Sequence, residues 1–216
     1  MPQGSSAAPV WFVKVINEVI KGLANVTDFL DDVIVFDSDP SAHVLTITGL
    51  FKRLRKHTLK LSPSNAKIGA TDADFLCHTI PPAGIRPNAN KVPELMKMPM
   101  RLHRKQLRSL LGGLSYYRKF LADMAKRIRS ITSLLTQGVK FVLTPSMETI
   151  VRTLLEELLA SPVSVFPDWD AVADTSSPFP LYCDASVNGF GATLEQEQTD
   201  GSICPIVFIS RSTLAS

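Results

Sequence analysis

Asp31 and Asp32 are the adjacent residues of this 216-residue chain whose types and spacing best suit chemistry. They lie in the middle of Val26–Phe36, where apolar residues on either side predict two strands with both carboxylates at the turn between them. Adjacent carboxylates repel each other unless a cation offsets their charge. Mg²⁺ suits such a pair, because it takes one or two carboxylates and completes its octahedron with water and substrate phosphate. The alternative is an ordinary hairpin turn, because Asp tolerates turn geometry well.

Helices and strands are predicted around this hairpin. Apolar residues at three- and four-residue steps predict a helix from about Pro9 to Lys21. A second helix is expected to begin with Asp39 as N-cap and Pro40 at its first position. Its buried face is expected to hold Val44, Ile47, Phe51 and Leu54. Residues 67–80 predict another hairpin, and the Pro-rich residues 81–99 predict a connector. Helices that cover one face of an antiparallel sheet indicate an α+β fold.

Charge is distributed unevenly along the chain, although its formal net value is only +3. From Arg86 to Arg129 there are twelve basic and two acidic residues, whereas residues 130–216 hold three basic and ten acidic ones. A basic cluster of this kind is typical of nucleic-acid-binding proteins. An ordinary solvated helix surface is the alternative, but such surfaces usually mix the two signs. The sequence therefore predicts a segment that binds a polyanion, followed by a separate acidic unit.

One helix from about Arg104 to Met124 is predicted inside the basic segment. At about 100° per residue, its apolar side holds Leu107, Leu110, Leu114, Tyr117 and Leu121. The opposite side holds Arg104, Arg108, Gly112, Ser115 and Lys119. Small residues between cations let a phosphate backbone come close, and Tyr116 borders this side, where it could pack on a sugar or base.

Two glycines in this predicted helix support the same interpretation. Gly112 and Gly113 each cost about 1 kcal/mol relative to Ala in a helix, so close approach of a ligand explains them better than helix propensity. The alternative role for Tyr117 is burial in the core, since it lies on the apolar side. The candidate nucleic-acid contacts are Arg104, Lys105, Arg108, Gly112, Ser115, Tyr116, Arg118 and Lys119.

The last part of the chain predicts a small sheet. A Pro- and Asp-rich break at residues 162–180 precedes three predicted strands, around residues 181–184, 191–194 and 206–209. Three strands with an exposed edge and no covering helix make a poor independent fold. We therefore expect an incomplete sheet here.

Bulk features limit the class of protein. Hydrophobic residues make up 45% of the chain, enough for the core of one or two domains. The three cysteines are odd in number and widely spaced, so we expect a reducing intracellular compartment, either cytoplasm or nucleus. No secretory signal and no membrane-spanning apolar run are visible, so no membrane partner is expected. The sequence does not indicate an oligomeric state.

The order of the motifs resembles that of reverse transcriptases, and most closely the pol polyproteins of gypsy-type long-terminal-repeat retrotransposons. Pro2–Pro9 matches the family's P-x-G-x-x-x-A-P loop, and Phe29–Asp32 matches its Y-x-D-D hairpin with Phe in place of Tyr. Asp184-Ala185-Ser186 resembles the opening strand of the family's ribonuclease H domain. Seven blocks follow the family's order over nearly the whole chain, at residues 1–20, 26–36, 57–61, 75–80, 84–87, 107–120 and 184–192.

The resemblance implies two-metal nucleotidyl transfer on an RNA/DNA template–primer duplex, with deoxynucleoside triphosphates and with Mg²⁺ or, as its alternative, Mn²⁺. Asp31 and Asp32 would be catalytic metal ligands, and Phe29 takes the place of the usual Tyr. Gln3 and Gly4 match the loop that touches the incoming nucleotide. Lys60 falls in the family's L-K-L block, where it could donate a proton to pyrophosphate or be a plain surface lysine.

The resemblance also implies what the rest of the chain does. The helix beginning near Arg104 matches the thumb that grips the template–primer duplex, and the hairpin Phe75–Ile80 positions the primer end, with Cys77 where the family usually has Gly. Asp184 would be a catalytic metal ligand of the ribonuclease H site. The family's third polymerase Asp would precede Met1, and its next ribonuclease H acid would follow Ser216. We therefore expect both sites to be incomplete.

Three segments are expected: a partial reverse-transcriptase palm at 1–85, thumb and connecting helices at 86–161, and a truncated ribonuclease H-like domain at 162–216. The expected function is that of an RNA-directed DNA polymerase fragment that is inactive in isolation. The alternative is a non-catalytic nucleic-acid-binding remnant of a retroelement pol protein. A protein-interaction module built on the Pro-rich connector is a third possibility, although no repeated ligand motif supports it.

Overall fold

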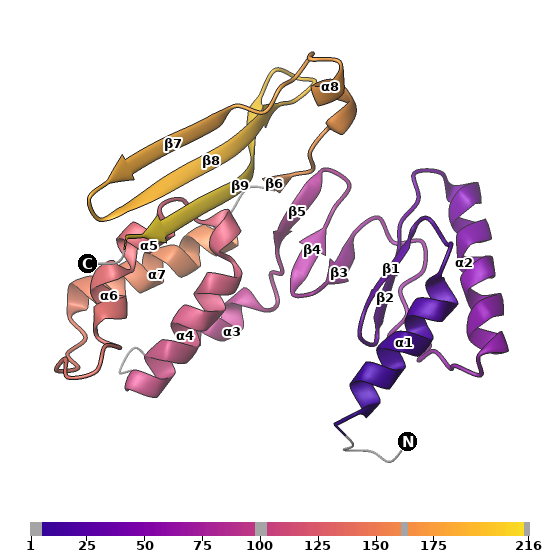
Figure 1. The fold of residues 1–216 in the computed structure, drawn as a ribbon, viewed down its shortest axis with the longest axis horizontal. Helices are drawn as coiled ribbons and strands as arrows, with labels where there is room; N and C mark the ends of the chain where they lie inside the picture. The colour runs from indigo at the N-terminus through magenta and orange to yellow at the C-terminus, as the bar shows by residue number, and fades with distance from the viewer. Residues whose placement is uncertain (1–5, 98–102, 161–163, 214–216) are drawn as a thin grey trace. The chain divides into compact units, whose positions relative to one another are not determined.

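The computed structural model describes residues 6–97, 103–160 and 164–213 (Figure 1). The chain divides into two compact units, Met1–Phe75 and Leu76–Ser216. The three segments expected from the sequence, at 1–85, 86–161 and 162–216, divide the chain by function and not by compactness. Their limits stay a prediction. Across the described ranges, no helix is both long enough and apolar enough to span a bilayer.

The first unit contains two helices beside a two-stranded hairpin (Figure 1). Its elements are α1 (Ala8–Ile20), β1 (Val26–Phe29), β2 (Asp32–Val35), α2 (Pro40–Lys56) and β3 (Ala73–Phe75). Its buried core consists of Ile16, Val19, Val26, Leu50 and Leu54. The two predicted helices and the hairpin between them are confirmed.

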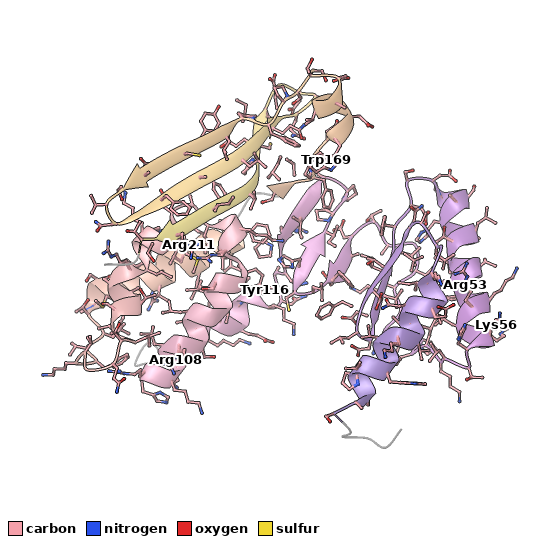
Figure 2. All side chains as sticks on the ribbon, viewed as in Figure 1. Arg53, Lys56, Arg108, Tyr116, Trp169 and Arg211 are labelled. Carbon is pink, nitrogen blue, oxygen red and sulfur yellow. The ribbon has the colours of Figure 1, made fainter. Side chains whose placement is uncertain are left out.

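Local signals account for these helices and for how they meet. Asp39 caps α2, because its carboxylate accepts a hydrogen bond from the Ala42 backbone N–H at 2.7 Å. Arg53 of α2 donates from its guanidinium to the backbone oxygens of Val19 and Lys21, at the end of α1 (Figure 2). Those carbonyls have no partner inside their own helix, so this arginine ties the two helices together.

The buried face of α2 differs from the predicted one. Val44 and Phe51 are exposed, whereas Leu50 and Leu54 are buried. The face is rotated because His43 and Thr46 also point inward, where both hydrogen-bond the Asp37 carboxylate. The Asp37 side chain is only 1% exposed, and a buried carboxylate needs such partners, so part of the inner face of α2 is polar.

The second unit combines short strands, helices and a three-stranded sheet (Figure 1). Its first strands are β4 (His78–Ile80), β5 (Gly84–Pro87) and β6 (Ser164–Val165), which are neighbours in that order. Its helices are α3 (Val92–Met96), α4 (Arg104–Tyr116), the 3₁₀ helix η1 (Arg118–Phe120), α5 (Met124–Arg127), α6 (Arg129–Ser133), α7 (Pro145–Ala160) and α8 (Trp169–Ala173). Its last sheet contains β7 (Leu181–Ser186), β8 (Gly189–Glu197) and β9 (Ile203–Ser212).

The main core of this unit lies between its helices. Leu107, Leu110 and Leu114 of α4 are fully buried, as are Leu154 and Leu158 of α7. Residues at i, i+3 and i+7 lie on one side of a helix, so α4 presents a single apolar side to this core. The apolar side predicted for this helix is confirmed up to Leu114.

Two predictions about the middle of the chain are wrong. The helix predicted to reach Met124 ends at Tyr116 and is followed by η1, after which Leu121 is extended and Asp123 adopts a left-handed φ of 51°. These bends let Leu121 and Met124 reach the same core as α4. The predicted connector at 81–99 contains β5 and α3, since Gly84 and Ile85 pair with β6 and Val92 is fully buried.

The last sheet is an antiparallel meander in the order β7-β8-β9, which confirms the three predicted strands. Asp184 is paired with Gly191 across β7 and β8, and Gly191 with Ser210 across β8 and β9. Contrary to expectation, helices do lie against this sheet. The Ala125 N–H of α5 donates to Ser210 Oγ at 3.0 Å, and η1 also contacts β9. This contact supplies the support that three strands alone would lack.

Candidate functional site

Asp31 and Asp32 lie at the end of the β1–β2 hairpin, as predicted. Phe29 pairs with Asp32, which leaves Leu30 and Asp31 as a two-residue turn. Leu30 has a φ of 56°, a left-handed conformation that the first position of a type II′ turn requires and that Gly adopts most easily. Both carboxylates are exposed. The turn therefore presents two carboxylates to solvent.

These two carboxylates fit part of a metal site. In residues 6–97, 103–160 and 164–213, no three His, Cys, Asp or Glu side chains come together as a metal-binding group. Asp31 and Asp32 suit one Mg²⁺ that takes its other ligands from phosphate and water. A two-metal centre needs more ligands than the described residues bring to this turn.

The other predicted nucleotide contacts are placed as follows. Phe29 is 51% exposed and pairs with Asp32, so the ring and the carboxylate lie on one face of the hairpin. Lys60 is exposed and lines an open hollow in the first unit, together with apolar side chains such as Phe51 and Leu59. Gln3 and Gly4 lie outside the described residues.

The exposed surface of α4 brings together most of the predicted nucleic-acid contacts. Lys105, Arg108 and Gly112 are exposed, and Tyr116 is 50% exposed near the end of the helix (Figure 2). Ser115 is half-buried beside them. A Cβ added at Gly112 would meet no atom within 4 Å. The helix therefore has an open backbone position between cations and an exposed aromatic ring.

Three predicted contacts are engaged within the protein. Arg104 donates to the backbone oxygens of Thr136 at 3.2 Å and Val139 at 2.7 Å, and it lies over the Phe141 ring. Arg118 donates to the Ser210 carbonyl at 3.4 Å. The Lys119 ammonium lies 5.1 Å from the centre of the Phe120 ring, and burial lowers its pKa. All three side chains stabilise the second unit, and their contact with nucleic acid stays a prediction.

A cluster of aromatic side chains that the sequence did not predict joins α4 to the turn before β4. The Tyr116 hydroxyl donates to the Leu76 carbonyl at 2.6 Å, and the Tyr117 hydroxyl donates to the Cys77 carbonyl at 3.0 Å. The His78 ring lies between 5.3 and 5.7 Å from the rings of both tyrosines. Burial raises the pKa of Tyr117 to about 12, so this hydroxyl keeps its proton at neutral pH. The core role considered for Tyr117 is confirmed, since it is buried.

One signal in the sequence could have revealed this cluster. Cys77 stands where the resembled family usually has Gly, and its φ in the structure is 59°. Gly adopts such a conformation freely, whereas other residues do so at a cost. A non-Gly residue at a position that favours Gly indicates that surrounding contacts hold the backbone there.

Asp184 lies in β7 beside a small pocket that also contains Asp123, Lys126 and Arg211. Asp123 Oδ1 lies against Gly191, the residue that pairs with Asp184. The nearest further acid along β8, Glu195, is four residues beyond Gly191, or about 13 Å at the usual rise of a strand. Among the described residues, no group of three His, Cys, Asp or Glu side chains that could hold a metal includes Asp184, so its role as a metal ligand stays a prediction.

Comparisons with known proteins agree with this architecture. Residues 1–80 match the family described as "Reverse transcriptase (RNA-dependent DNA polymerase)", and residues 143–216 match "RNase H-like domain found in reverse transcriptase". The chain is 32% identical to the retrovirus-related Pol polyprotein from transposon 297 of Drosophila melanogaster, over 98% of this chain and 19% of that protein. It is 30% identical to the Pol polyprotein from transposon opus of the same species, over 98% of this chain and 22% of that protein.

Solved structures share the fold. The foamy viral protease–reverse transcriptase dRH in complex with double-stranded DNA superimposes with a TM-score of 0.81 at 19% identity, over 98% of this chain and 36% of that one. The foamy viral enzyme in complex with an RNA/DNA hybrid gives 0.78 at 18% identity, over 99% and 28%. The predicted α+β fold class is confirmed.

The chain spans about one fifth of the length of its curated transposon relatives. The two family matches lie at its two ends, in the order in which the sequence motifs predicted them. The chain is therefore a relative of retrotransposon Pol polyproteins that combines reverse-transcriptase sequence with RNase H-like sequence of the kind found in reverse transcriptases.

Proposed function

We propose that this chain is part of the reverse transcriptase of a gypsy-type long-terminal-repeat retrotransposon and that α4 binds the template–primer duplex. The exposed surface of α4 carries this proposal. Lys105 and Arg108 place positive charge beside Gly112, where the open backbone gives a phosphate chain room to approach. The foamy viral enzymes that share the fold are described in complex with double-stranded DNA and with an RNA/DNA hybrid, which supports the proposal.

Asp31 and Asp32 are the proposed ligands of Mg²⁺, for which Mn²⁺ is a possible substitute. The metal, when bound, would activate the primer hydroxyl and offset the charge that develops on the transferred phosphate. The two carboxylates would hold the ion at the exposed end of the hairpin, and the deoxynucleoside triphosphate would supply further oxygen ligands. The Phe29 ring lies on the same face as Asp32, where it can pack against a sugar. Gln3, Gly4 and Lys60 are proposed to contact the incoming nucleotide.

Catalysis by the isolated chain is not part of the proposal. The described residues bring two carboxylates to the hairpin and no group of three acids anywhere. Loss of a ligand from such a site commonly removes several kcal/mol of transition-state stabilisation, or roughly a thousandfold in rate. The same observation favours the second candidate function, a non-catalytic remnant that binds nucleic acid through α4.

The free cysteines Cys77, Cys183 and Cys204 support an intracellular location, in cytoplasm or nucleus.

Duplex binding is tested by fluorescence anisotropy with a labelled RNA/DNA hybrid over a series of salt concentrations. The expected affinity falls steeply with salt and shows little sequence preference. Replacement of Lys105 and Arg108 by Ala should weaken binding and reduce the salt slope by about two units. Lys140 and Arg152, which are also exposed and lie outside α4, give a matched control with the same loss of charge. An affinity that does not change with salt would overturn the proposal.

Primer extension separates the two candidate functions. The chain alone should show no extension with Mg²⁺ or Mn²⁺. Addition of the amino-terminal part of the transposon 297 reverse transcriptase, fused or as a separate fragment, should give extension that Asp31→Asn abolishes. Extension by the chain alone would contradict the argument from missing ligands. Extension that survives Asp31→Asn would overturn the role of Asp31, and a chain that binds duplex but cannot be complemented is the remnant.

A further inference from the structure

The turn between Phe75 and His78 has a backbone that its own sequence does not favour. Its two residues, Leu76 and Cys77, have φ values of 49° and 59°. Two consecutive left-handed residues are typical of a type I′ turn, for which Asn-Gly is the preferred sequence. Leu and Cys carry a Cβ that crowds the backbone in this conformation. Contacts from outside the turn must therefore hold it.

Those contacts are hydrogen bonds to the two carbonyls of the turn. The Leu76 carbonyl accepts from the Tyr116 hydroxyl at 2.6 Å and from His78 Nδ1 at 2.7 Å. The Cys77 carbonyl accepts from the Tyr117 hydroxyl at 3.0 Å and from the Asn88 backbone N–H at 3.1 Å. Since a carbonyl only accepts, His78 carries its proton on Nδ1. Each carbonyl thus receives two donors, one of them a tyrosine at the end of α4.

Tyr116 and Tyr117 differ in what else they contact. Tyr117 is 4% exposed and belongs to the helical core. Tyr116 is 50% exposed and lies at the end of the α4 surface proposed to bind duplex (Figure 2). Their rings meet edge to face with centres 5.1 Å apart. The pair therefore connects the core, the turn and the proposed binding surface within one unit.

We propose that Tyr116 and Tyr117 are positioning residues whose hydroxyls hold the Leu76–Cys77 turn in the left-handed conformation that duplex binding requires. This inference rests on the proposed function of α4, and it says which side chains hold the hairpin that the resemblance expects to position the primer end. The turn and α4 then act as one rigid element, so that a duplex lying along Arg108 and Gly112 also meets the turn at Tyr116. The hydroxyls act through the backbone of the turn, and Tyr117 itself touches no nucleic acid.

The first experiment tests the clamp without nucleic acid. The hydrogen-exchange rate of the Asn88 backbone N–H reports on the turn, because this N–H donates to the Cys77 carbonyl. Tyr117→Phe removes one oxygen atom and should speed this exchange about fivefold, the factor expected for one hydrogen bond of usual net strength. Tyr182→Phe, at an exposed position of β7, is the matched control and should leave it unchanged. Unchanged exchange in Tyr117→Phe would overturn the clamp.

The second experiment tests positioning by rescue. Tyr116→Phe and Tyr117→Phe should each weaken binding of the RNA/DNA hybrid about fivefold at fixed salt, with the melting temperature measured alongside. Leu76→Asn together with Cys77→Gly gives a sequence that forms the type I′ turn by itself. In that background either Tyr→Phe change should have little effect on affinity. If the tyrosines matter only for core packing, the new turn sequence will not restore binding, and the proposal fails.

The outcomes separate this inference from the proposed function. A wild-type chain that binds no duplex would overturn both the role of α4 and the link between turn and binding, while exchange at Asn88 would still decide whether the clamp exists. Faster exchange with unchanged affinity would leave the role of α4 in place and overturn the positioning role of the two tyrosines.

Discussion

Leu95 Cδ2 lies 2.9 Å from the point where a Cβ on Gly113 would stand. Gly113 is therefore the position at which α3 packs closely on α4. Its neighbour Gly112 has no atom within 4 Å of the same point. The two glycines thus serve different purposes. Gly113 allows close packing inside the protein, whereas Gly112 leaves an open surface on the proposed duplex-binding side.

Alanine at these two positions should have opposite effects. Gly112→Ala should stabilise the fold by roughly 0.5–1 kcal/mol, because Ala is the better helix former and meets no neighbour. The same methyl should weaken hybrid binding, since it occupies the space proposed for the backbone of the duplex. Gly113→Ala should gain no stability, because Leu95 must move, and should leave affinity unchanged.

Denaturant unfolding and fluorescence anisotropy on both variants check this prediction. Each variant is the control of the other, because the substitution and the helix are the same. Equal affinities for Gly112→Ala and the wild type would show that the open position is not used by nucleic acid.

Gln196 should be the most sensitive polar side chain of the last sheet. It is fully buried, its Oε1 accepts from the Asp168 N–H at 2.8 Å, and its Nε2 donates to the carbonyls of Asp168 and Ser177 at 3.0 Å each. Gln196→Leu keeps the size of the side chain but leaves three part-buried backbone groups, two of Asp168 and one of Ser177, without this partner. The expected loss is about 2–4 kcal/mol of unfolding free energy, from the usual cost of such groups.

Urea unfolding measures this loss, with the exposed Gln137→Leu as a control that removes a side-chain amide at no buried site. A loss below about 0.5 kcal/mol would mean that the segment around Asp168 rearranges without Gln196. Gln196→Glu adds a discriminating case, because it keeps an acceptor for the Asp168 N–H and loses the donor to both carbonyls.

Local signals in the sequence predicted much of the first unit. The Asp39 side chain and the Pro40 ring together define the start of α2, and neither depends on distant residues. The Val26–Phe36 hairpin was predicted because its apolar strands and polar turn are contiguous. The exposure of Val44 was not, since it depends on the hydrogen bonds that Asp37 receives from α2.

Contacts between residues far apart in sequence explain the other failures. Tyr116 and Tyr117 each bond to a carbonyl forty residues earlier, and no periodic pattern encodes such a pairing. Arg104 was assigned to the polar side of its helix correctly, but its carbonyl partners at Thr136 and Val139 come from a loop whose path the sequence does not give. Helix periodicity predicts sides of a helix, whereas partners depend on the tertiary fold.

Stability should fall as pH drops from 7.5 to 5.5 because of His78. Burial, followed by the nearby Lys119 charge, lowers the pKa of this imidazole in the folded state. Below about 6.5, the ordinary value for His, the unfolded chain takes up a proton that the folded chain resists. Protonation of His78 therefore favours unfolding. Its contribution to the stability is lost as the pH falls below the pKa of His in the unfolded chain.

Urea unfolding at several pH values compares the wild type with His78→Phe. The variant loses the bond to Leu76 and should be less stable at pH 7.5, but its stability should change less between pH 7.5 and 5.5. His57→Phe, at a position that is not fully buried, is the control. A wild-type profile no steeper than that of His78→Phe would show that His78 takes up its proton equally in both states.

Asp184 should support no ribonuclease activity in this chain. Its pocket contains one further carboxylate, Asp123, together with Lys126 and Arg211, and hydrolysis of RNA by a two-metal site needs several acids. The chain should leave the RNA strand of an RNA/DNA hybrid intact with Mg²⁺ or Mn²⁺.

In an Asp31→Asn, Asp32→Asn background, neither metal should raise the melting temperature, because a ligand stabilises a protein only where the folded state binds it. Gel analysis of the hybrid and a thermal shift series measure the two outcomes. Metal-dependent cleavage that disappears in Asp184→Asn would contradict this prediction and would point to Glu195 or Glu197 as acids brought to Asp184 by a rearranged sheet.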